Sequence, residues 1–435
     1  MKFMSFNDTL KWLYSFQKFG IKLGLERISF ISKQLGCPHK DYRVIHVGGT
    51  NGKGSVCMFL ESILTSAGYK VGVYTSPHLQ HISERLAIGK NRISEDELVS
   101  IVNKIKPIIS MMIKNNNSPT FFEIITAIAF YYFSCKKVDF AIIEVGLGGR
   151  YDATNIVDST VLIITNVSLE HQNILGKNIK DIALEKAGLI KKNIPLVTAA
   201  KGESLKIIEM VANKSDIPIY KIDNKKWKRI KHNQISQDFV INGILKDYSV
   251  RTQMLGEYQG ENIALTISAI ENLQMKGIYI TDADILDGFE KAFNPGRMEF
   301  VGYEPTILLD GAHNKAGMES LANSIRNDFR YNKLIVILGI LADKDIPQML
   351  SIIVPIASIV ITTKSNISRD CEPSDLKKMI AKFNIKREVI VKENIIDAVE
   401  YAKSIAEKND IICITGSLFI VGKARDYLVT QADID

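Results

Sequence analysis

The sequence predicts an α/β fold in two parts: a P-loop, parallel-sheet domain of the ATPase type, followed by a smaller Rossmann-like α/β domain. Short apolar, β-branched segments alternate with amphipathic helical segments along most of the chain, a pattern typical of parallel strands covered by helices. A glycine-rich loop follows an early apolar segment. Asn, Pro and Gly at residues 293–297 (FNPGR) then mark a turn or linker between two such series.

The two series give the expected strands and the expected domains. In the first series we expect strands at residues 43–47, 70–74, 139–145 and 160–165, with an antiparallel ribbon over 238–254. In the second series we expect them at residues 306–310, 333–339, 358–363, 388–391 and 410–415. We therefore predict domains 1–296 and 297–435. Ligands of such sheets bind beyond the carboxyl ends of the strands, so we expect the chemistry in a cleft between the domains.

Composition is that of a globular protein, with 46% hydrophobic and 24% charged residues. The net charge of +7 comes from 55 basic and 48 acidic residues, which mildly favours anionic ligands. This excess is too small and too dispersed to predict binding to nucleic acid. The densest basic run, residues 225–231 (KKWKRIK), is interpreted as a solvated strand or loop edge.

Membrane and secretory signals are not expected in this sequence. No segment approaches the roughly 20 apolar residues of a membrane helix, and the first 20 residues read as an amphipathic helix without a small-residue cleavage site. The five cysteines are scattered and form no CxxC pair. We therefore expect a cytoplasmic protein with reduced thiols, no zinc cluster and no membrane partner.

The strongest local signal is the phosphate loop within residues 43–55 (RVIHVGGTNGKGS), which lies between an apolar segment and a helix expected to start at about Ser55. Its glycines let backbone N–H groups point at phosphate oxygens, and the helix N-terminus adds partial positive charge. Lys53 can reach terminal phosphates, and a hydroxyl of Thr50 or Ser55 can approach Mg²⁺. The loop departs from the strict GxxxxGK[ST] pattern, so a turn-rich structural loop is the alternative. The predicted nucleotide-binding residues here are Thr50, Asn51, Gly52, Lys53, Gly54 and Ser55.

The loop residues GTNGKGS resemble those of the Mur ligase superfamily. Further motifs follow in order: GLERI (24–28), YTSPHL (74–79), PTFFE (119–123), EVGLGGRYDATN (144–155), EKAG (185–188), PGRME (295–299), DGAHN (310–314) and TGSLF (415–419). Together they identify the chain as resembling the folylpolyglutamate synthase/dihydrofolate synthase family. Two residues depart from the family pattern: Glu170 stands where an Asp usually precedes His171, and Lys315 stands where Pro often follows the DGAHN motif.

The resemblance implies an ATP-dependent ligase that adds L-glutamate to tetrahydrofolate, and also to dihydropteroate. In this reaction ATP phosphorylates a carboxylate, an amine attacks the acyl phosphate, and ADP and phosphate are released. The implied cofactors are ATP and Mg²⁺, and the implied partners are small molecules. We expect a monomer, since two domains of one chain supply the cleft.

The resemblance also implies a set of metal ligands: Ser76, Glu144, His171 and Lys186. Glu144 ends an apolar strand, and carboxylate oxygens suit Mg²⁺; an ion pair at the sheet edge is the alternative. Imidazole is an unusual ligand for Mg²⁺, and Ser76 can instead cap the segment that follows it. Lys186 is implied to be carbamylated and, as an anionic carbamate, to help hold a second Mg²⁺. This requires a desolvated amine; a solvated lysine is the alternative. Lys53, His171, Lys186 and His313 are the implied catalytic residues.

The resemblance implies further residues that bind the nucleotide or glutamate. Asn262, Arg297 and Asp310 are implied to contact ATP, with Arg297 beside the PGR turn; an interdomain ion pair is the alternative for Arg297. His313 is implied to orient phosphate or the incoming glutamate. Ser417 lies before the last expected helix, whose N-terminus can bind a carboxylate.

Phe121 and Phe122 are candidates for stacking on a pterin or aminobenzoyl ring, with helix packing as the alternative. Arg85 and Arg150 are further candidates for guiding anionic groups. A Mur-type peptidoglycan-precursor ligase is the alternative within the superfamily, but only about 40 residues precede the loop, too few for the additional substrate domain of those enzymes. A P-loop switch or mechanical ATPase gives no reason for the DGAHN and TGSLF motifs.

Overall fold

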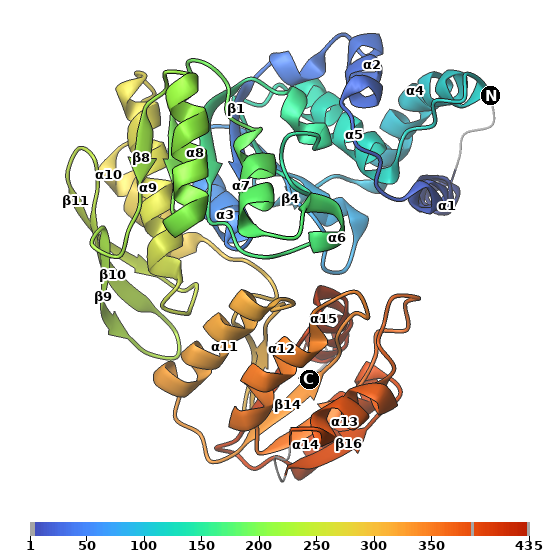
Figure 1. Cartoon of the computed structure of the whole chain (residues 1–435), viewed down its shortest axis with the longest axis vertical. Coiled ribbons are helices and arrows are strands. Elements are labelled where there is room, and N and C mark those ends of the chain that lie inside the picture. The colour runs from blue at the N-terminus through green and yellow to red at the C-terminus, as the bar shows by residue number, and fades with distance from the viewer. Residues whose placement is uncertain (1–4, 384–386, 433–435) are drawn as a thin grey trace. The chain divides into compact units, whose positions relative to one another are not determined.

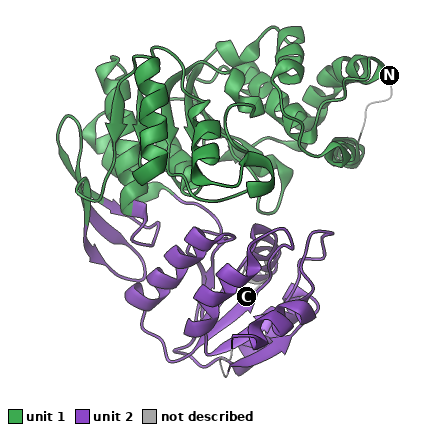
Figure 2. Cartoon of the chain, viewed as in Figure 1, with its two compact units in different colours: residues 1–228, 240–250, 260–292 green, residues 229–239, 251–259, 293–435 purple. Residues whose placement is uncertain are grey.

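The computed structural model describes residues 5–383 and 387–432 (Figure 1). Contacts between Cα atoms divide the chain into two compact units (Figure 2). Unit 1 comprises residues 1–228, 240–250 and 260–292, and unit 2 comprises residues 229–239, 251–259 and 293–435. Unit 2 therefore includes two short segments from the first half of the chain, which no single boundary describes. The predicted functional domains 1–296 and 297–435 stay a prediction.

Unit 1 is built on an eight-stranded sheet of order β4-β3-β2-β5-β1-β6-β7-β8. In this order every pair from β2 to β8 is parallel, whereas the pairs β2–β3 and β3–β4 at one edge are antiparallel. The strands are β1 (Arg43–Gly48), β2 (Val71–Tyr74), β3 (Leu86–Ile88), β4 (Asn91–Arg92), β5 (Phe140–Glu144), β6 (Ser159–Ile164), β7 (Leu196–Thr198) and β8 (Ile219–Lys221). β5 is buried along its whole length, as expected of a central parallel strand covered on both faces.

Helices cover this sheet and pack in groups (Figure 1). Their bounds are α1 (Phe6–Tyr14), α2 (Glu26–Gln34), α3 (Lys53–Ser66), α4 (Glu95–Lys114), α5 (Phe121–Lys136), α6 (Gln172–Leu175), α7 (Ile179–Ala187), α8 (Gly202–Lys214), α9 (Gln259–Met275) and α10 (Asp282–Lys291). Apolar side chains of α1, α2, α4 and α5 share one core cluster. α3 and α10 cross closely at Gly288, where a Cβ would lie 2.5 Å from the Cα of Ile63.

Local sequence explains where several of these helices begin. Thr120 caps α5, and Glu123 accepts a hydrogen bond from the Thr120 backbone in return, which satisfies two of the N–H groups at the helix start. Ser94 and Glu97 form the same arrangement at α4. α3 begins at Lys53, slightly before the expected start at about Ser55, so the phosphate loop runs directly into the helix.

A separate three-stranded sheet has the order β11-β10-β9. Its strands are β9 (Trp227–His232), β10 (Gln237–Asn242) and β11 (Asp247–Thr252). The expected ribbon over 238–254 therefore corresponds to β10 and β11. The basic run at 225–231 forms most of β9, whose side chains are largely exposed, in agreement with the interpretation of that run as a solvated strand.

Unit 2 contains a six-stranded sheet of order β12-β13-β17-β14-β15-β16, parallel except for β12 against β13. The strands are β12 (Glu299–Tyr303), β13 (Thr306–Leu309), β14 (Leu334–Leu338), β15 (Ile359–Thr362), β16 (Glu388–Val391) and β17 (Ile411–Thr415). The helices are α11 (Lys315–Asp328), α12 (Ile346–Ile353), α13 (Pro373–Ala381), α14 (Ile395–Ile405) and α15 (Leu418–Ala432). All five strands expected here are present. The predicted α/β fold with two parallel-rich sheets is confirmed.

Candidate functional site

The phosphate loop joins β1 to α3 in a conformation that requires glycine at two points. Gly49 has φ +128° and Gly52 has φ +87°. A Cβ on Gly49 would lie 2.0 Å from the Thr165 hydroxyl oxygen, and a Cβ on Gly52 would lie 2.4 Å from Oδ1 of Asn262. Both the backbone conformation and the lack of space exclude larger side chains here. Asn262, predicted to contact the nucleotide, is thus placed by α9 against this loop.

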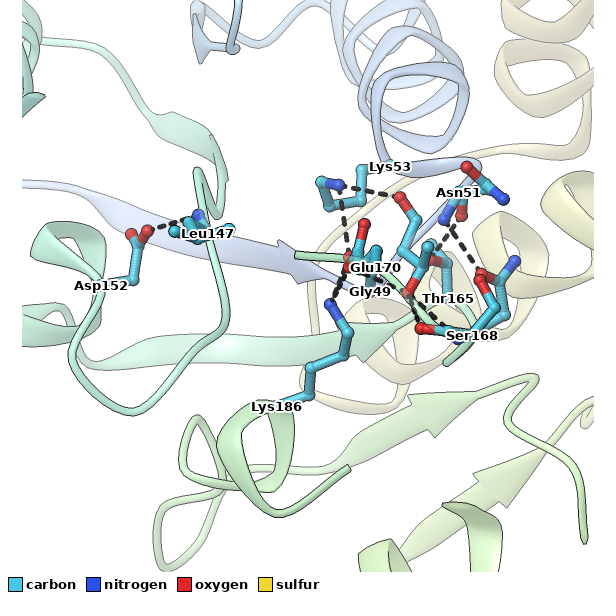
Figure 3. Close-up of polar contacts among 11 residues, drawn as sticks. Gly49, Asn51, Lys53, Leu147, Asp152, Thr165, Ser168, Glu170 and Lys186 are labelled. Atoms are coloured by element: carbon cyan, nitrogen blue, oxygen red, sulfur yellow. Dashed lines mark hydrogen bonds and ion pairs between the residues drawn. The ribbon is translucent and has the colours of Figure 1, made fainter. Parts of the chain in front are cut away.

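Hydrogen bonds join the phosphate loop to the segment that follows β6, the strand next to β1 (Figure 3). The Thr50 backbone N–H donates to the Asn166 backbone carbonyl at 2.9 Å. The Asn51 N–H donates to Asn166 Oδ1 at 3.0 Å, and the Thr165 hydroxyl donates to the Asn51 carbonyl at 2.7 Å. The carboxyl ends of two neighbouring parallel strands are therefore connected through their loops.

Glu170 is the centre of a charged cluster beneath this loop (Figure 3). Lys186 Nζ lies 2.7 Å from Glu170 Oε1 and donates to the Gly49 carbonyl at 2.9 Å. The Thr50 hydroxyl donates to the same carboxylate oxygen at 2.9 Å. Lys53 Nζ lies against the loop and donates to the carbonyls of Gly49 and Thr50 at 3.2 and 3.0 Å. The phosphate loop thus rests on a carboxylate flanked by ammonium groups.

Burial and charge act in opposite directions on the pKa values of this cluster. Burial tends to raise the pKa of Glu170, but the ammonium groups of Lys186 and Lys53 outweigh it and hold that pKa at about 2. Burial lowers the pKa of Lys186, whose side chain is 1% exposed, and the Glu170 carboxylate opposes this shift. In the sequence, Glu170 stands out only as a departure from the family pattern, and it was not predicted to be a site residue. That departure, an acidic residue directly before a predicted ligand, was the signal that could have found it.

Two of the four predicted metal ligands lie side by side at the carboxyl edge of the sheet. Glu144 is the last residue of β5, is 5% exposed and accepts a hydrogen bond from the Ser76 backbone N–H at 2.9 Å. Carboxylate and hydroxyl oxygens are the ligands that Mg²⁺ prefers, so this pair is chemically suited to that ion. His171 precedes α6 in the left-handed conformation, with φ 44°. Within residues 5–383 and 387–432, no three His, Cys, Asp or Glu side chains form a metal-binding group.

The predicted ring-stacking residues differ in their surroundings. Phe121 is 9% exposed; Tyr14 stacks on it with ring centroids 5.7 Å apart, and the Arg85 guanidinium lies over its ring at 5.6 Å. Phe122 is half-buried, with its centroid 6.1 Å from that of Tyr74. Of the two, Phe122 has the larger exposed part. The side chain of Arg150, a lesser candidate, is exposed.

In unit 2, Asp310 follows β13 and is held by backbone groups. Its carboxylate accepts hydrogen bonds from the N–H groups of Met298 at 3.0 Å and Ala312 at 2.9 Å. Burial raises the pKa of Asp310, and the guanidinium of Arg297 opposes this shift. The two residues predicted to bind nucleotide from this part of the chain are therefore electrostatic neighbours.

An ion pair between Glu299 and Arg425 stabilises the turn at residues 293–297. Glu299 accepts from the Gly296 N–H at 2.7 Å and from Nε of Arg425, on α15, at 2.9 and 3.0 Å. This contact ties the start of β12 to the last helix. Glu299 belongs to the PGRME motif, but no role was predicted for it.

The predicted glutamate-binding residues lie after neighbouring strands of the same sheet. Ring nitrogen Nδ1 of His313 lies 2.8 Å from the Gly311 carbonyl oxygen, which places the proton of that bond on Nδ1. Ser417 follows β17, is 1% exposed, and its hydroxyl oxygen accepts from the Phe419 N–H at 3.2 Å at the start of α15. Since β13 and β17 pair in parallel, both residues belong to the carboxyl edge of this sheet.

Comparison with known proteins defines the class. The family model for the Mur ligase middle domain matches residues 47–270, and the model for the Mur ligase glutamate ligase domain matches residues 296–418. The chain therefore has the two-domain architecture of a Mur-type, ATP-dependent ligase.

Full-length relatives narrow the class to one family. The chain is 36% identical to the dihydrofolate synthase/folylpolyglutamate synthase of Bacillus subtilis, over 98% of this chain and 100% of that protein. Its structure is similar to that of the Mycobacterium tuberculosis folylpolyglutamate synthase complexed with ADP, with a TM-score of 0.90, 29% identity and coverage of 98% and 99%. It is also similar to E. coli FolC in complex with DHPP and ADP, with a TM-score of 0.86, 28% identity and 98% coverage of both chains. The chain belongs to the folylpolyglutamate synthase/dihydrofolate synthase family, and not to the peptidoglycan-precursor ligases considered as the alternative.

Proposed function

We propose that this ligase adds L-glutamate to tetrahydrofolate, and also to dihydropteroate, through an acyl-phosphate intermediate. The observation that carries the proposal is the cluster of Lys186, Glu170 and Thr50 directly beneath the phosphate loop, in a chain of this family. The M. tuberculosis relative with ADP and the E. coli relative with DHPP and ADP support a nucleotide and a small-molecule acceptor as ligands.

Residues of unit 1 are proposed to bind the ATP phosphates and Mg²⁺. The backbone N–H groups of residues 49–55 provide donors, and Lys53 provides a positive charge. Glu144, Ser76 and His171 would hold one Mg²⁺, and a carbamylated Lys186 would help to hold a second; when bound, these ions neutralise phosphate charge. Because Lys186 is buried and its pKa is lowered, its amine meets the first requirement for reaction with CO₂.

The reaction balances in two steps. A carboxylate oxygen of the acceptor attacks the γ-phosphorus of ATP, the bond to the β-phosphate oxygen breaks, and ADP leaves. The amine of L-glutamate then attacks the acyl carbon, loses a proton and expels inorganic phosphate. The site residues bind and orient these groups and exclude water, which would hydrolyse the acyl phosphate.

Unit 2 is proposed to supply further contacts. Arg297 and Asp310, together with Asn262 of unit 1, are assigned to the nucleotide. His313 and Ser417 are assigned to phosphate or the incoming glutamate, since both follow neighbouring parallel strands. Phe122, with its more exposed ring, is the better candidate than Phe121 for contact with the pteroyl group.

We further propose that the protein acts as a cytoplasmic monomer on small molecules, without a nucleic-acid partner. All five cysteines are free, as expected of a reducing compartment. No helix among the described residues has the length and apolar character needed to cross a bilayer.

The proposal is tested by measuring ADP release from ATP, Mg²⁺ and L-glutamate with dihydropteroate or tetrahydrofolate as acceptor. Turnover with both acceptors establishes the bifunctional enzyme, and turnover with tetrahydrofolate alone restricts it to polyglutamylation. No glutamate-dependent release with either acceptor, from protein that binds ADP and unfolds cooperatively, would overturn the proposed substrates.

Carbamylation of Lys186 has its own test. Native mass spectrometry in bicarbonate should show a mass increase of one CO₂ that is absent from Lys186→Met. A plain amine at Lys186 under CO₂-containing conditions, in both the mass spectrum and an electron-density map, would rule it out.

A further inference from the structure

Arg85 is a buried cation that donates a hydrogen bond to a neutral imidazole. It ends a short 3-10 helix, Ile82–Arg85, immediately before β3, and is 8% exposed. Its Nε donates to Nδ1 of His78 at 2.8 Å. A ring nitrogen that accepts a hydrogen bond carries no proton, so this partner offers an acceptor but no negative charge.

The neighbouring carboxylates are engaged by other groups. Glu84 accepts from the N–H groups of Leu79 at 2.7 Å and His81 at 2.9 Å, and its carboxylate lies 3.5 Å from Arg92. Glu144 accepts from the Ser76 N–H. Across the part of the chain that the structure describes, no carboxylate oxygen lies within 4.0 Å of the Arg85 guanidinium. A buried charge without a close counter-ion is costly, so an anionic ligand is the expected compensation.

An aromatic pair lies on one side of the same guanidinium. It lies over the Phe121 ring, on which Tyr14 also stacks. Burial lowers the pKa of Arg85, and Tyr74 and Glu144 at the end of β5 are among the groups that oppose this shift. Arginine in such a setting presents a planar, pre-oriented fork that matches the two oxygens of a carboxylate. Flat apolar faces next to a carboxylate receptor suit an aromatic acid.

We propose that Arg85 binds a carboxylate of the pteroyl substrate and orients it beside Glu144. The proposal rests on the proposed function and deepens it, because it assigns a residue that selects acceptors carrying a carboxylate. In dihydropteroate the free carboxylate is on the aminobenzoyl ring, and in tetrahydrofolate the free carboxylates are on the glutamate that follows this ring. In either acceptor the carboxylate to be phosphorylated has to lie near the residues proposed to hold Mg²⁺. Arg85 is thus assigned to the acceptor and not to the nucleotide or to free glutamate.

The first test compares two ligands on the wild-type enzyme by calorimetry in the absence of ATP. The first ligand is dihydropteroate or tetrahydrofolate, whichever the enzyme turns over. The second ligand is the same molecule with every carboxylate converted to the primary amide. The acid should bind at least tenfold more tightly than the amide. Equal affinity would overturn the proposal without any variant.

The second test uses Arg85→Gln and Arg85→Lys, with Arg92→Gln as the matched control, since Arg92 is a nearby but largely exposed arginine. In Arg85→Gln the acid should bind 10- to 100-fold more weakly and the amide should be unaffected. Arg85→Lys should recover part of the loss, because it keeps the charge and loses the planar fork. ADP affinity should be unchanged in both, and Arg92→Gln should match wild type throughout.

The outcomes separate this proposal from the proposed function. Wild-type turnover together with unchanged acid affinity in the folded Arg85 variants would refute the role of Arg85 and leave the function intact. Weakened ADP or L-glutamate binding in place of weakened acid binding would also refute it. No turnover by wild type would instead refute the substrates. If neither Arg85 variant folds, the comparison of acid and amide on wild type decides.

Discussion

In unit 1, the buried ammonium of Lys186 faces the Glu170 carboxylate at 2.7 Å, whereas in unit 2 the buried carboxylate of Asp310 is held by two backbone N–H groups. The first arrangement depends on two side chains from different segments, a loop and a helix. The second depends on the path of the backbone around β13. Removing one member of a buried ion pair leaves the other member as an isolated buried charge. Replacing the Asp310 carboxylate by an amide leaves the two backbone N–H groups with one acceptor oxygen, so only part of the hydrogen bonding is lost. The two sheets should therefore respond differently to substitution.

The largest effect is expected for Lys186→Met. It leaves Glu170 without the counter-charge that the uncarbamylated amine supplies, and it removes the amine on which the proposed carbamate would form. Glutamate-dependent ADP release should therefore fall by about 100- to 1,000-fold, comparable to loss of a key transition-state contact. Unit 1 should lose roughly 3–5 kcal/mol of stability, as for other broken buried pairs. Both tryptophans, Trp12 and Trp227, belong to unit 1, so urea unfolding followed by tryptophan fluorescence reports on this unit.

The control for that experiment is Lys180→Met on the same helix, α7, because the Lys180 side chain is 60% exposed. It should change stability by less than about 0.5 kcal/mol. If Lys186→Met were as stable and as active as Lys180→Met, the ion pair would contribute little and the contrast between the units would fail.

The next effect is a pH dependence with opposite signs in the two units. The folded-state pKa of Glu170 is about 2, below its ordinary value of 4.5, so its contribution is fully present above about pH 4.5 and is lost as pH falls toward 2. The whole contribution is roughly 3 kcal/mol at most. Glu170→Gln should lose the acid-dependent part of the wild-type stability, measured as the midpoint of urea unfolding between pH 2 and 5, whereas exposed Glu203→Gln should keep it.

Asp310 should show the reverse dependence. Its folded-state pKa is raised by burial, so its contribution is present below the unfolded-state pKa and is lost as pH rises through the folded-state value. Hydrogen exchange in each unit measures how the stability of that unit depends on pH. If Asp310→Asn and Glu170→Gln changed this dependence with the same sign, the proposed difference between the units would be contradicted.

A smaller effect is expected for Gly49→Ala, which tests the phosphate loop of unit 1. A Cβ would contact Thr165, and φ +128° is unfavourable for alanine, so unit 1 should lose roughly 1–3 kcal/mol and ADP should bind more weakly. Gly68→Ala is the matched control, since its φ is +85° but its Cβ would meet nothing within 4 Å. The difference between the two variants isolates the steric part. Equal losses would mean that the contact with Thr165 relaxes without cost.

The smallest effect is expected for Asp310→Asn at neutral pH. Asn keeps one carbonyl oxygen as an acceptor and loses the second, while removal of a buried charge offsets part of that loss. The net destabilisation should be about 1 kcal/mol. It should appear as faster hydrogen exchange near Met298 and Ala312, with no change in the tryptophan transition of unit 1. A loss as large as that of Lys186→Met would remove the distinction between the two ways of holding charge.

Some elements of the structure were predictable from the sequence, and others were not. The strand, loop and helix at residues 43–66 were predictable because a short apolar segment, a glycine-rich loop and a helical segment follow one another there and all indicate the same local structure. β12 was not predicted because it is a short edge strand interrupted by Gly302. The partnership of Glu170 with Lys186 was not predictable, since α6 and a turn separate them and no periodicity relates a loop residue to a helix residue.

The sequence alone determined the α/β class, the positions of the main strands, the phosphate loop and the family, because these depend on local patterns of apolar residues, glycines and motifs. Tertiary structure decided which side chains meet. It placed Asn262 and Thr165 against the loop glycines, Glu170 between two lysines, and the Arg85 guanidinium over the Phe121 ring. Burial and pairing set charge states, and both depend on segments brought together only when the sheet forms.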